Sequence, residues 1–453
     1  MTYDFSQRRA GVLLHPTSLP SGTLDDADTW LDFMQVSGLS VWQVLPLGVP
    51  QADLSPYQCL SAFATNPALL TEIPPYQEGD AGFSRFCAEE SHWLDDYALF
   101  VVLKEQHQGK PWYEWPSAYK QRDEDTLELF REQHQASIRQ IRWQQYQLRR
   151  RWQELQRKAE ARQIRLFGDM PIFVAHDSAD VWACPRRFLL DEDGQPTWVA
   201  GVPPDYFSET GQRWGNPHYD WDYHLQEGFQ WWLARMRHHF RWFDLVRIDH
   251  FRGLQAVWMI PAQEQTAKNG HWQKVPGDAL LATLQQSMQH LPLVAEDLGI
   301  ITPEVRTLKK KYDLPGMAVL QFAFDAFEDN PHKPVNITPD CVAYTGTHDN
   351  DTTLGWYRSL DEDSRQLVQQ TLHMQDGDDP VDAMIGTLFH TRANLAVVPM
   401  QDFLKLGSEA RMNTPGVPNG NWRWRLAAQS LSAPDLSAHI LEQVINSKRK
   451  VTP

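Results

Sequence analysis

The segment FDLVRIDHFRG, residues 243–253, sets a cation and a carboxylate two positions apart inside an apolar stretch. Successive side chains of a β-strand point to opposite faces of the sheet, so residues i and i+2 share a face. Arg247 and Asp249 therefore share one face, while Val246 and Ile248 share the other. We expect a strand that uses one face for chemistry and the other for packing.

Carboxyl groups stand at the ends of four apolar runs along the chain. They are Asp169, Asp249, Glu296 and Asp349. In a (β/α)8 barrel, side chains at the carboxyl ends of the strands converge on the active site. A single acid in such a position is equally well explained as a cap of the following helix. Four acids together, accompanied by Arg247, His250 and His348, indicate a catalytic site instead.

Two of these carboxyl groups fit the apparatus that opens a glycosidic bond with retention of configuration. Arg247 keeps Asp249 ionised and fixes its carboxylate, as a nucleophile requires. Glu296 follows apolar residues in its strand, and because desolvation raises the pKa of a carboxyl group, it is the candidate for the protonated acid/base partner. This mechanism predicts that the two carboxyl groups lie about 5–5.5 Å apart.

A divalent metal site is the rival chemistry, because His250, His348, Asp349 and Asp351 are all possible ligands. Metal-dependent amidohydrolase-like barrels usually place a His-x-His pair at an early strand end, and this chain has no such pair. We therefore expect neither a metal nor an organic cofactor.

The elements that would position these residues are eight short apolar runs separated by helical stretches. Continuous apolar runs are typical of parallel strands buried on both faces, and the alternation with helices indicates βαβ units. The runs are residues 11–16, 41–48, 164–171, 244–251, 292–299, 317–325, 341–349 and 395–403. A ninth run, AVWMIPA at 256–262, is assigned to the connection after the fourth strand. The predicted fold is an α/β (β/α)8 TIM barrel.

Two large insertions interrupt this pattern in what we interpret as a single catalytic domain over residues 1–453. Residues 49–163 open with a loop, then become largely helical and end in a long charged helix over 137–163. A chain of two domains is the alternative. Residues 172–231 are rich in Pro, Gly and aromatic residues, which predicts an irregular, Pro-stiffened loop rather than a helix or strand.

The bulk composition excludes several classes of protein. A net charge of −16 argues against a nucleic-acid partner, which needs a basic surface. The four cysteines form no C-x-x-C pair, and no apolar run approaches the ~20 residues of a membrane-spanning helix or the length of a signal peptide core. We expect a cytoplasmic protein with reduced thiols. Its 19 tryptophans suit the faces of sugar rings as well as core packing.

The sequence resembles the 4-α-glucanotransferases, the amylomaltase or disproportionating-enzyme family of the α-amylase clan. The resemblance runs from about residue 9 to about 425 and rests on RIDHFRG, VAEDLG, YTGTHDNDTTLGWY, GDMPIFVAHDSADVW, AGVPPDYFSETGQRWGNP, LLHPTSLP, WQVLPLG and SPYQ. RIDHFRG alone would indicate only the wider clan, whereas the YFSETGQRWGNP loop is typical of this family.

The resemblance implies a role for each matching residue. Asp249 would be the nucleophile, Glu296 the acid/base, and Asp349 the third carboxylate, which holds the hydroxyls of the distorted glucose. The positions that surround the transferred ring would be Tyr57, Asp169, Arg247 and His348. The loop that overhangs the acceptor side would contribute Tyr206, Phe207, Gln212 and Trp214, and Asn413 would lie in a further loop. Such a loop would exclude water and bind the acceptor sugar.

Two segments depart from the family pattern. SGTLDDADTW follows LPS in place of a Gly-rich turn, and QADL precedes SPYQ in place of a GYGD-like sequence. Because LAVVPMQDF is followed by only 50 residues, we also expect no C-terminal β-domain. The implied enzyme is a minimal version of the family.

The leading hypothesis is a 4-α-glucanotransferase that moves α-1,4-linked glucan segments by double displacement. Its donors and acceptors would be maltooligosaccharides and starch-like or glycogen-like glucans, with glucose as a further acceptor. A hydrolase of the same clan is one alternative. A glucan-binding protein without catalysis is the other, although binding alone does not require three carboxyl groups at strand ends.

Overall fold

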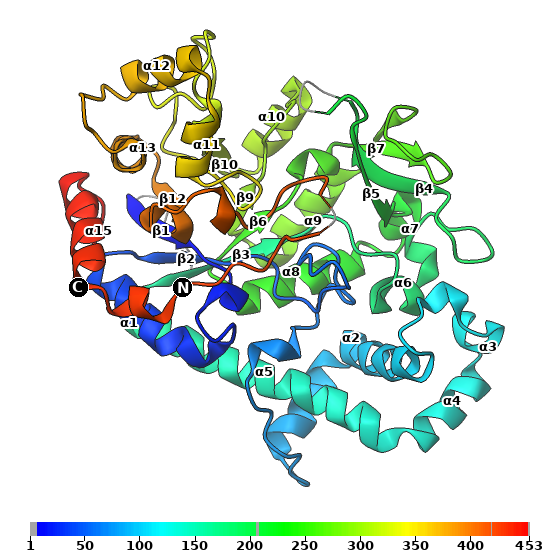
Figure 1. Cartoon of the computed structure of the whole chain (residues 1–453). Coiled ribbons are helices and arrows are strands. Elements are labelled where there is room, and N and C mark those ends of the chain that lie inside the picture. Colours follow the sequence, from blue (N-terminus) through cyan, green and yellow to red (C-terminus); the bar gives the residue numbers. More distant parts are fainter. Residues whose placement is uncertain (1–6, 205–207, 418, 452–453) are drawn as a thin grey trace.

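Eight parallel strands form one curled sheet at the centre of the molecule (Figure 1). The structure is a computed structural model and describes residues 7–204, 208–417 and 419–451. The strands are β1 (Arg9–Leu13), β2 (Val41–Gln43), β3 (Arg165–Met170), β6 (Leu245–Ile248), β9 (Leu293–Ala295), β10 (Gly316–Val319), β11 (Cys341–Tyr344) and β12 (Leu395–Pro399). Each overlaps one of the eight predicted runs, so the predicted strands are confirmed, with bounds that differ by a few residues.

The order of the strands closes the sheet into a barrel. Its order is β10-β11-β12-β1-β2-β3-β6-β9, so the two strands at the ends follow one another in sequence. The backbone N–H of Ala295 in β9 donates to the carbonyl of Pro315, just before β10, at 2.8 Å. This contact joins the ends of the sheet and confirms the (β/α)8 class.

Side chains alternate along the barrel strands between an inner and an outer apolar cluster. The inner cluster includes Leu13, Val41, Phe167, Leu245, Val294, Met317, Val319, Val342, Tyr344, Leu395 and Val397. Val246 and Ile248 belong to the outer cluster, under the helices. Two residues beyond the inner Phe167, Leu245 and Val294 come Asp169, Arg247 and Glu296. The inward-pointing side chains of these three adjacent strands are therefore apolar inside the barrel and ionisable at its carboxyl end.

Helices cover the outside of the barrel between successive strands (Figure 1). These are α1 (Ala27–Val36), α5 (Gln135–Ala161), α8 (Gln230–Trp242), α9 (Gly277–Met288), α10 (Pro303–Lys311), α11 (Thr353–Ser359), α12 (Glu362–Thr371), α13 (Pro380–His390) and the one-turn α14 (Met400–Phe403). The last helix, α15 (Pro434–Asn446), packs against α1 and α13. The connection from β10 to β11 contains no α-helix among its described residues.

The segment between β2 and β3 is largely helical, as expected. It contains α2 (Ala81–Gln106), α3 (Ser117–Lys120), α4 (Glu124–Gln133) and α5. The predicted charged helix over 137–163 is α5, and its buried stripe includes Trp143, Leu148 and Trp152. Helix α2 packs along α5, so the two form a lobe beside the barrel (Figure 1).

The prediction that residues 172–231 form only an irregular loop is wrong. This segment contains α6 (Ala179–Ala183), β4 (Trp198–Val202), β5 (Gln212–Pro217) and α7 (Trp221–Gln226). Strands β4 and β5 join β7 (Ala256–Pro261) and β8 (His271–Lys274) in a four-stranded antiparallel sheet of order β5-β4-β7-β8. The pairing partner β7 lies about 60 residues further along the chain, so the local Pro and Gly content could not reveal it. The ninth apolar run, β7, lies outside the barrel, as assigned.

The four cysteines are all unpaired, in agreement with the expected reduced thiols. Among the described residues, no helix is long and apolar enough to cross a membrane.

A close approach between α9 and the turn that follows β6 gives a test of the fold. Gly277 begins α9, and a Cβ at this position would overlap the carbonyl oxygen of Leu254 in the turn. We expect Gly277→Ala to lower the free energy of unfolding by about 1–3 kcal/mol or more, because the backbone of one element must move. Urea unfolding of the purified variant measures the change.

Gly386, within α13, provides the matched control. A Cβ there meets no atom within 4 Å, so Gly386→Ala should leave stability unchanged or raise it by about 0.5–1 kcal/mol, since Ala favours helix more than Gly. Equal effects of the two substitutions would contradict the close contact at Gly277.

Candidate active site

Arg247 lies buried between two carboxylates at the carboxyl end of the barrel. Its Nη1 donates to both carboxylate oxygens of Asp169, at 2.9 and 2.8 Å, and its Nη2 lies 2.8 Å from Asp249 Oδ1. The side chains of Arg247 and Asp169 are 5% and 0% exposed, whereas that of Asp249 is 29% exposed. Burial alone would lower the pKa of Arg247, but Asp169 and Asp249 raise it well above its usual value. The guanidinium therefore stays charged and fixes both carboxylates.

Tyr57 extends this arrangement from the SPYQ segment. Its hydroxyl donates to Asp169 Oδ2 at 2.6 Å. Burial, together with the charge of Asp169, raises the pKa of Tyr57 well above its usual value, so the phenol remains a donor. The Tyr57 ring stacks on His348 with centroids 5.2 Å apart, and Trp422 packs against both rings. These rings form an aromatic surface beside the carboxylates.

Glu296 stands directly after β9 and is held by two backbone donors. The N–H of His250 donates to Glu296 Oε2 at 2.7 Å, and that of Leu298 donates to Oε1 at 3.1 Å. Burial raises the pKa of Glu296 to about 7, with Asp249 adding to the rise while Arg247 and the two N–H donors oppose it. This carboxyl group can therefore be protonated or ionised near neutral pH, as a general acid/base must be.

His250 links this carboxyl group to the β4–β5 segment. Its backbone is left-handed, with φ 50° and ψ 51°, which directs its N–H toward Glu296. Burial lowers the pKa of His250 to about 4, so its ring is neutral. The Trp214 ring packs edge-on against it with centroids 4.9 Å apart, and Trp214 Nε1 donates to Gln212 Oε1 at 3.1 Å. The β5 strand therefore reaches the site through Trp214.

Asp349 follows β11 and is the most exposed carboxylate of the group, at 45% of its side chain. Asn413 Nδ2 donates to Asp349 Oδ1 at 2.6 Å, and His348 Nε2 lies 3.4 Å from Oδ2. Arg411 ties the two loops together by donating to the carbonyls of Asp349 and Asn413, at 2.6 and 2.7 Å. The loop that contains Asn413 therefore orients Asp349 directly.

A buried carboxylate anchors the turn that carries His348 and Asp349. Asp402, 1% exposed in the one-turn α14 that follows β12, accepts bonds from the hydroxyls of Thr345 and Thr353 at 2.6 and 2.7 Å and from the Thr353 N–H at 2.7 Å. These bonds hold both ends of the turn to the neighbouring strand.

The structure brings together most of the residues that the sequence singled out. Those in contact with one another are Tyr57, Asp169, Arg247, Asp249, His250, Glu296, His348, Asp349 and Asn413. Trp214 contacts this group through His250, and Gln212 is exposed beside it. Tyr206 and Phe207 lie outside the described residues.

Sequence reasoning missed Arg411, Trp422 and Asp402. Arg411 stands two positions before Asn413 in RMNTPG, so the same motif could have indicated it. Nothing local indicates Trp422 or Asp402, because their partners lie in distant segments. Among the described residues no group of three or more His, Cys, Asp or Glu side chains is arranged to hold a metal ion.

The chain is similar to known proteins of one family over most of its length. The sequence model of the 4-alpha-glucanotransferase family matches residues 13–74 and 72–431. The 4-alpha-glucanotransferase of Thermus thermophilus is 45% identical over 482 aligned positions, covering 94% of this chain and 96% of that protein. That of Synechocystis sp. is 41% identical, covering 96% of each. The amylomaltase from Streptococcus agalactiae, solved in complex with acarbose, has a TM-score of 0.94 and 32% identity, covering 98% of this chain and 100% of that one. The chain therefore belongs to the 4-alpha-glucanotransferase family and is an enzyme of glucan transglycosylation.

Proposed function

We propose that this enzyme transfers α-1,4-glucan segments by a retaining double displacement in which Asp249 is the nucleophile and Glu296 the acid/base. In the first step the Asp249 carboxylate bonds to C1 of the donor glucose while Glu296 gives its proton to the departing glycosidic oxygen. In the second step the Glu296 carboxylate takes a proton from an acceptor hydroxyl, whose oxygen bonds to C1 and releases Asp249. The single observation that carries the proposal is that Asp249 forms an ion pair with Arg247, whereas desolvation raises the pKa of the nearby Glu296 to about 7.

The choice of Asp249 over Asp169 as nucleophile rests on access. Asp169 is fully buried and its two oxygens accept bonds from Arg247 and Tyr57. A carboxylate committed in this way cannot attack a sugar. Asp249 contacts Arg247 through Oδ1 and keeps 29% of its side chain exposed. Asp169 therefore serves to hold Arg247, and Arg247 serves to aim Asp249.

The remaining residues are assigned to binding the sugar chain. Asp349 accepts hydrogen bonds from the hydroxyls of the reacting glucose and favours its distorted form. The rings of Tyr57, His348 and Trp422 provide a flat surface for a pyranose, because apolar C–H faces pack on aromatic rings. Trp214 and Gln212 belong to the acceptor side and restrict the access of water to the glucosyl-enzyme.

For the substrates we propose maltooligosaccharides and starch-like or glycogen-like α-1,4-glucans as donors and acceptors, with glucose as a further acceptor. The family membership supports the α-glucan class. The extended aromatic and polar surface around Asp349 supports a chain of sugars rather than a monosaccharide alone. We further propose that residues 1–453 act as one catalytic domain whose insertions, about 49–163 and 172–231, shape its binding surfaces.

Incubation of the purified protein with maltotriose, without added metal, tests the reaction class. We expect glucose together with maltopentaose and longer chains, while the number of reducing ends stays constant, because each transfer breaks one glycosidic bond and forms another. Chromatography of the products and a reducing-end assay measure both quantities. Glucose and maltose with rising reducing ends would instead identify a hydrolase, and no change would favour a binding protein.

Replacement of the nucleophile tests the assignment of roles. We expect Asp249→Asn to lower the rate of transfer by at least about a thousandfold, because no covalent glucosyl-enzyme can form. Maltodextrin binding, measured by calorimetry, should remain. Asp363→Asn, an exposed position in α12, is the control and should keep full activity. Substantial activity in Asp249→Asn would show that another residue is the nucleophile.

The raised pKa of Glu296 predicts the pH dependence of the first step. Below its pKa of about 7 the group carries the proton that the departing oxygen needs. The value of kcat/KM for maltotriose should therefore fall as the pH rises through about 7. Initial rates at low substrate, measured in closely spaced buffers from about pH 5 to about pH 9, give the profile. A constant kcat/KM across this range would contradict the role of Glu296 as the acid.

A further inference from the structure

The side chain of Arg252 joins the two turns that carry Asp249 and Glu296. Arg252 stands three positions after Asp249, in the short 3₁₀ turn η6 (Phe251–Leu254), and its Nη1 donates to the carbonyl of Ile300 at 2.8 Å. Ile300 stands four positions after Glu296, in the segment between β9 and α10. The bond is to the backbone, so it constrains the path of the segment that begins at Glu296.

A tryptophan of the small antiparallel sheet restrains the Arg252 guanidinium. The guanidinium carbon lies 3.9 Å from the centroid of the Trp272 ring in β8. Trp272 packs against Trp258, its cross-strand partner in β7, with ring centroids 5.3 Å apart, and Trp258 Nε1 donates to the carbonyl of Ala267 at 2.9 Å. A planar guanidinium is attracted to an aromatic face and stacks on it. Trp272 therefore holds Nη1 of Arg252 toward Ile300.

The segment after Glu296 is hydrogen-bonded at its start and at its end. Asp297 fixes the start, because its Oδ1 accepts a bond from the N–H of Met317 at 2.8 Å and its Oδ2 pairs with Lys309. Gly299 has a φ of 79°, and a Cβ there would meet no atom within 4 Å. Among the described residues, only Arg252 forms a hydrogen bond with residues 299–301. The hydrogen bonding of the end of this segment therefore depends on Arg252.

The N–H of Leu298 lies between these two anchors and is one of the two donors to the Glu296 carboxyl group. Its bond to Oε1 measures 3.1 Å, whereas the bond from the His250 N–H to Oε2 measures 2.7 Å. The Leu298 bond is close to the upper limit of N–H···O hydrogen bonds, so a small displacement of Leu298 weakens it. The position of this donor is the point at which the anchors of the segment affect the chemistry.

The charged and titratable neighbours of Glu296 do not depend on this contact. Arg247 and Asp249 act on Glu296 and pair with each other at 2.8 Å, and the ring of His250 is neutral because burial lowers its pKa to about 4. The carboxylate that acts on Arg252 is that of Glu304 in α10. Loss of the Arg252 side chain therefore leaves the neighbours of Glu296 in place and changes the geometry of Leu298.

We propose that Arg252 is a positioning residue for Glu296: by holding the Ile300 carbonyl, it keeps the Leu298 N–H directed at the carboxyl group. A carboxyl group that is fixed in this way is oriented for proton transfer to the departing glycosidic oxygen. The inference rests on the proposed role of Glu296 as the acid/base, and it assigns a task to Arg252 and Trp272, which do not contact the reacting carboxyl groups.

A donor that needs no protonation separates this role from general damage to the protein. Maltotriose requires a proton at its departing oxygen, whereas α-maltosyl fluoride releases fluoride without one. Initial rates at low substrate give kcat/KM, which reports the first displacement for both donors. We expect Arg252→Ala to lower kcat/KM for maltotriose at least about fivefold, because proton transfer is impaired, and to leave kcat/KM for α-maltosyl fluoride unchanged. Chromatography follows the first donor and a fluoride electrode the second.

The pH profile of kcat/KM for maltotriose is a second readout. The Leu298 N–H favours the ionised form of Glu296, so its displacement raises the pKa of this group. The fall of kcat/KM at high pH should therefore move up by about 0.5–1 unit in Arg252→Ala. Trp272→Leu keeps the charge of Arg252 and removes the ring that restrains it, so it should show a smaller shift in the same direction. A shift in Arg252→Ala with none in Trp272→Leu would show that the charge alone acts and would overturn the proposal.

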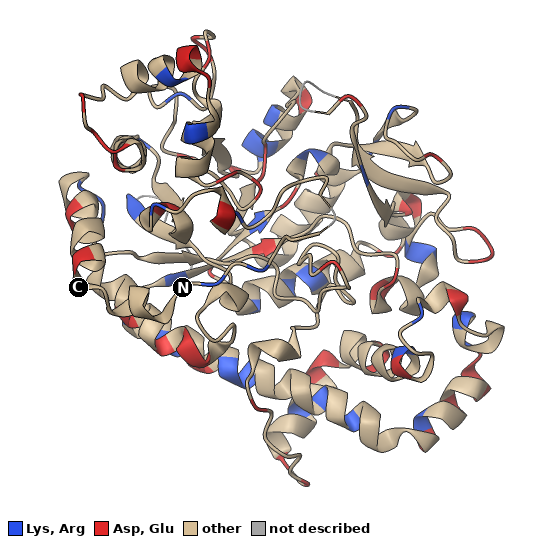
Figure 2. Ribbon diagram, viewed as in Figure 1, with Lys and Arg blue, Asp and Glu red and all other residues tan. Residues whose placement is uncertain are grey.

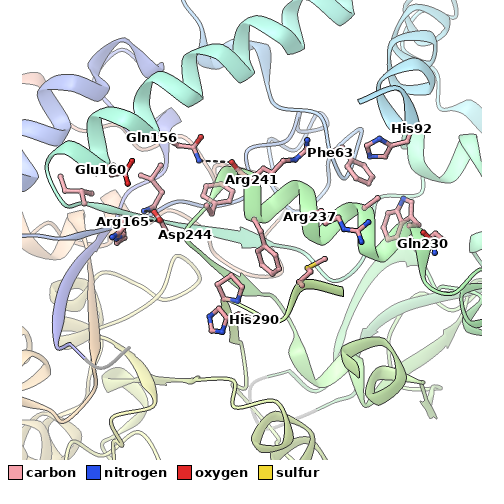
Figure 3. Close-up of a pocket in the computed structure, with 18 of the residues that line it drawn as sticks. Phe63, His92, Gln156, Glu160, Arg165, Gln230, Arg237, Arg241, Asp244 and His290 are labelled. Atoms are coloured by element: carbon pink, nitrogen blue, oxygen red, sulfur yellow. Dashed lines mark hydrogen bonds and ion pairs between the residues drawn. The ribbon is translucent and has the colours of Figure 1, made fainter. Parts of the chain in front are cut away.

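Arg237 provides the matched control. Figure 3 shows this exposed arginine of α8 in a groove on the outside of the barrel, where it donates to Ser287 Oγ at 2.6 Å. Leu166, Asp244 and Pro292 also line the groove, at the amino ends of the strands, so it lies opposite to the active site. Arg237→Ala should keep the wild-type kcat/KM for both donors and the wild-type pH profile.

Glu296→Ala tests the function on which the inference rests. It should lower kcat/KM for maltotriose by at least about a hundredfold, because the acid is lost, and keep that for α-maltosyl fluoride. Equal losses for both donors would show that Glu296 is not the acid, and the inference would be wrong with it. If Glu296→Ala behaves as expected while Arg252→Ala lowers kcat/KM equally for both donors, or for neither, only the positioning role of Arg252 is wrong.

Discussion

The active site depends on the ion pairs that the buried guanidinium of Arg247 forms with Asp169 and Asp249. Three charged groups meet at the carboxyl end of β3 and β6, and two of them have almost no exposure to water. Removing one partner of a buried ion pair leaves an uncompensated charge and costs about 3–5 kcal/mol. Asp169 therefore has a structural task that precedes any chemistry: it neutralises and orients the arginine that in turn orients Asp249. The hydroxyl of Tyr57 completes the arrangement from a segment more than 100 residues away.

Around this cation, the barrel gives two carboxyl groups opposite environments. Asp249 pairs with Arg247 at 2.8 Å, whereas desolvation raises the pKa of the half-buried Glu296 to about 7. In the proposed mechanism the first group is the nucleophile and the second is the proton donor and acceptor, and their different surroundings suit them to these different tasks. The difference arises from position: Asp249 follows the strand that contains the arginine, and Glu296 follows its neighbour, where the left-handed turn at His250 covers it.

Charged residues of both signs are spread over the outer helices, whereas four carboxyl groups meet at the carboxyl ends of the barrel strands. Figure 2 shows Lys and Arg interspersed with Asp and Glu along the ribbons of the outer helices. At the strand ends, Asp169, Asp249, Glu296 and Asp349 belong to one network of contacts that also includes Arg247 and His348. The concentration of carboxyl groups at this one place therefore distinguishes the site from the general surface.

The sequence alone determined the eight barrel strands, the long helix α5 and the three candidate catalytic carboxyl groups. These features are local: an apolar run has a strand period, and Arg247 and Asp249 must share a face because they are two residues apart. The sequence did not reveal that residues 198–202 and 212–217 are strands, because they form a sheet only by pairing with β7 and β8, which lie further along the chain. Nor did it reveal Asp402 or Trp422, whose partners lie in other segments. Only the tertiary structure decided that Asp169 is buried while Asp249 is partly exposed to solvent, since burial depends on which segments of the chain pack over each side chain.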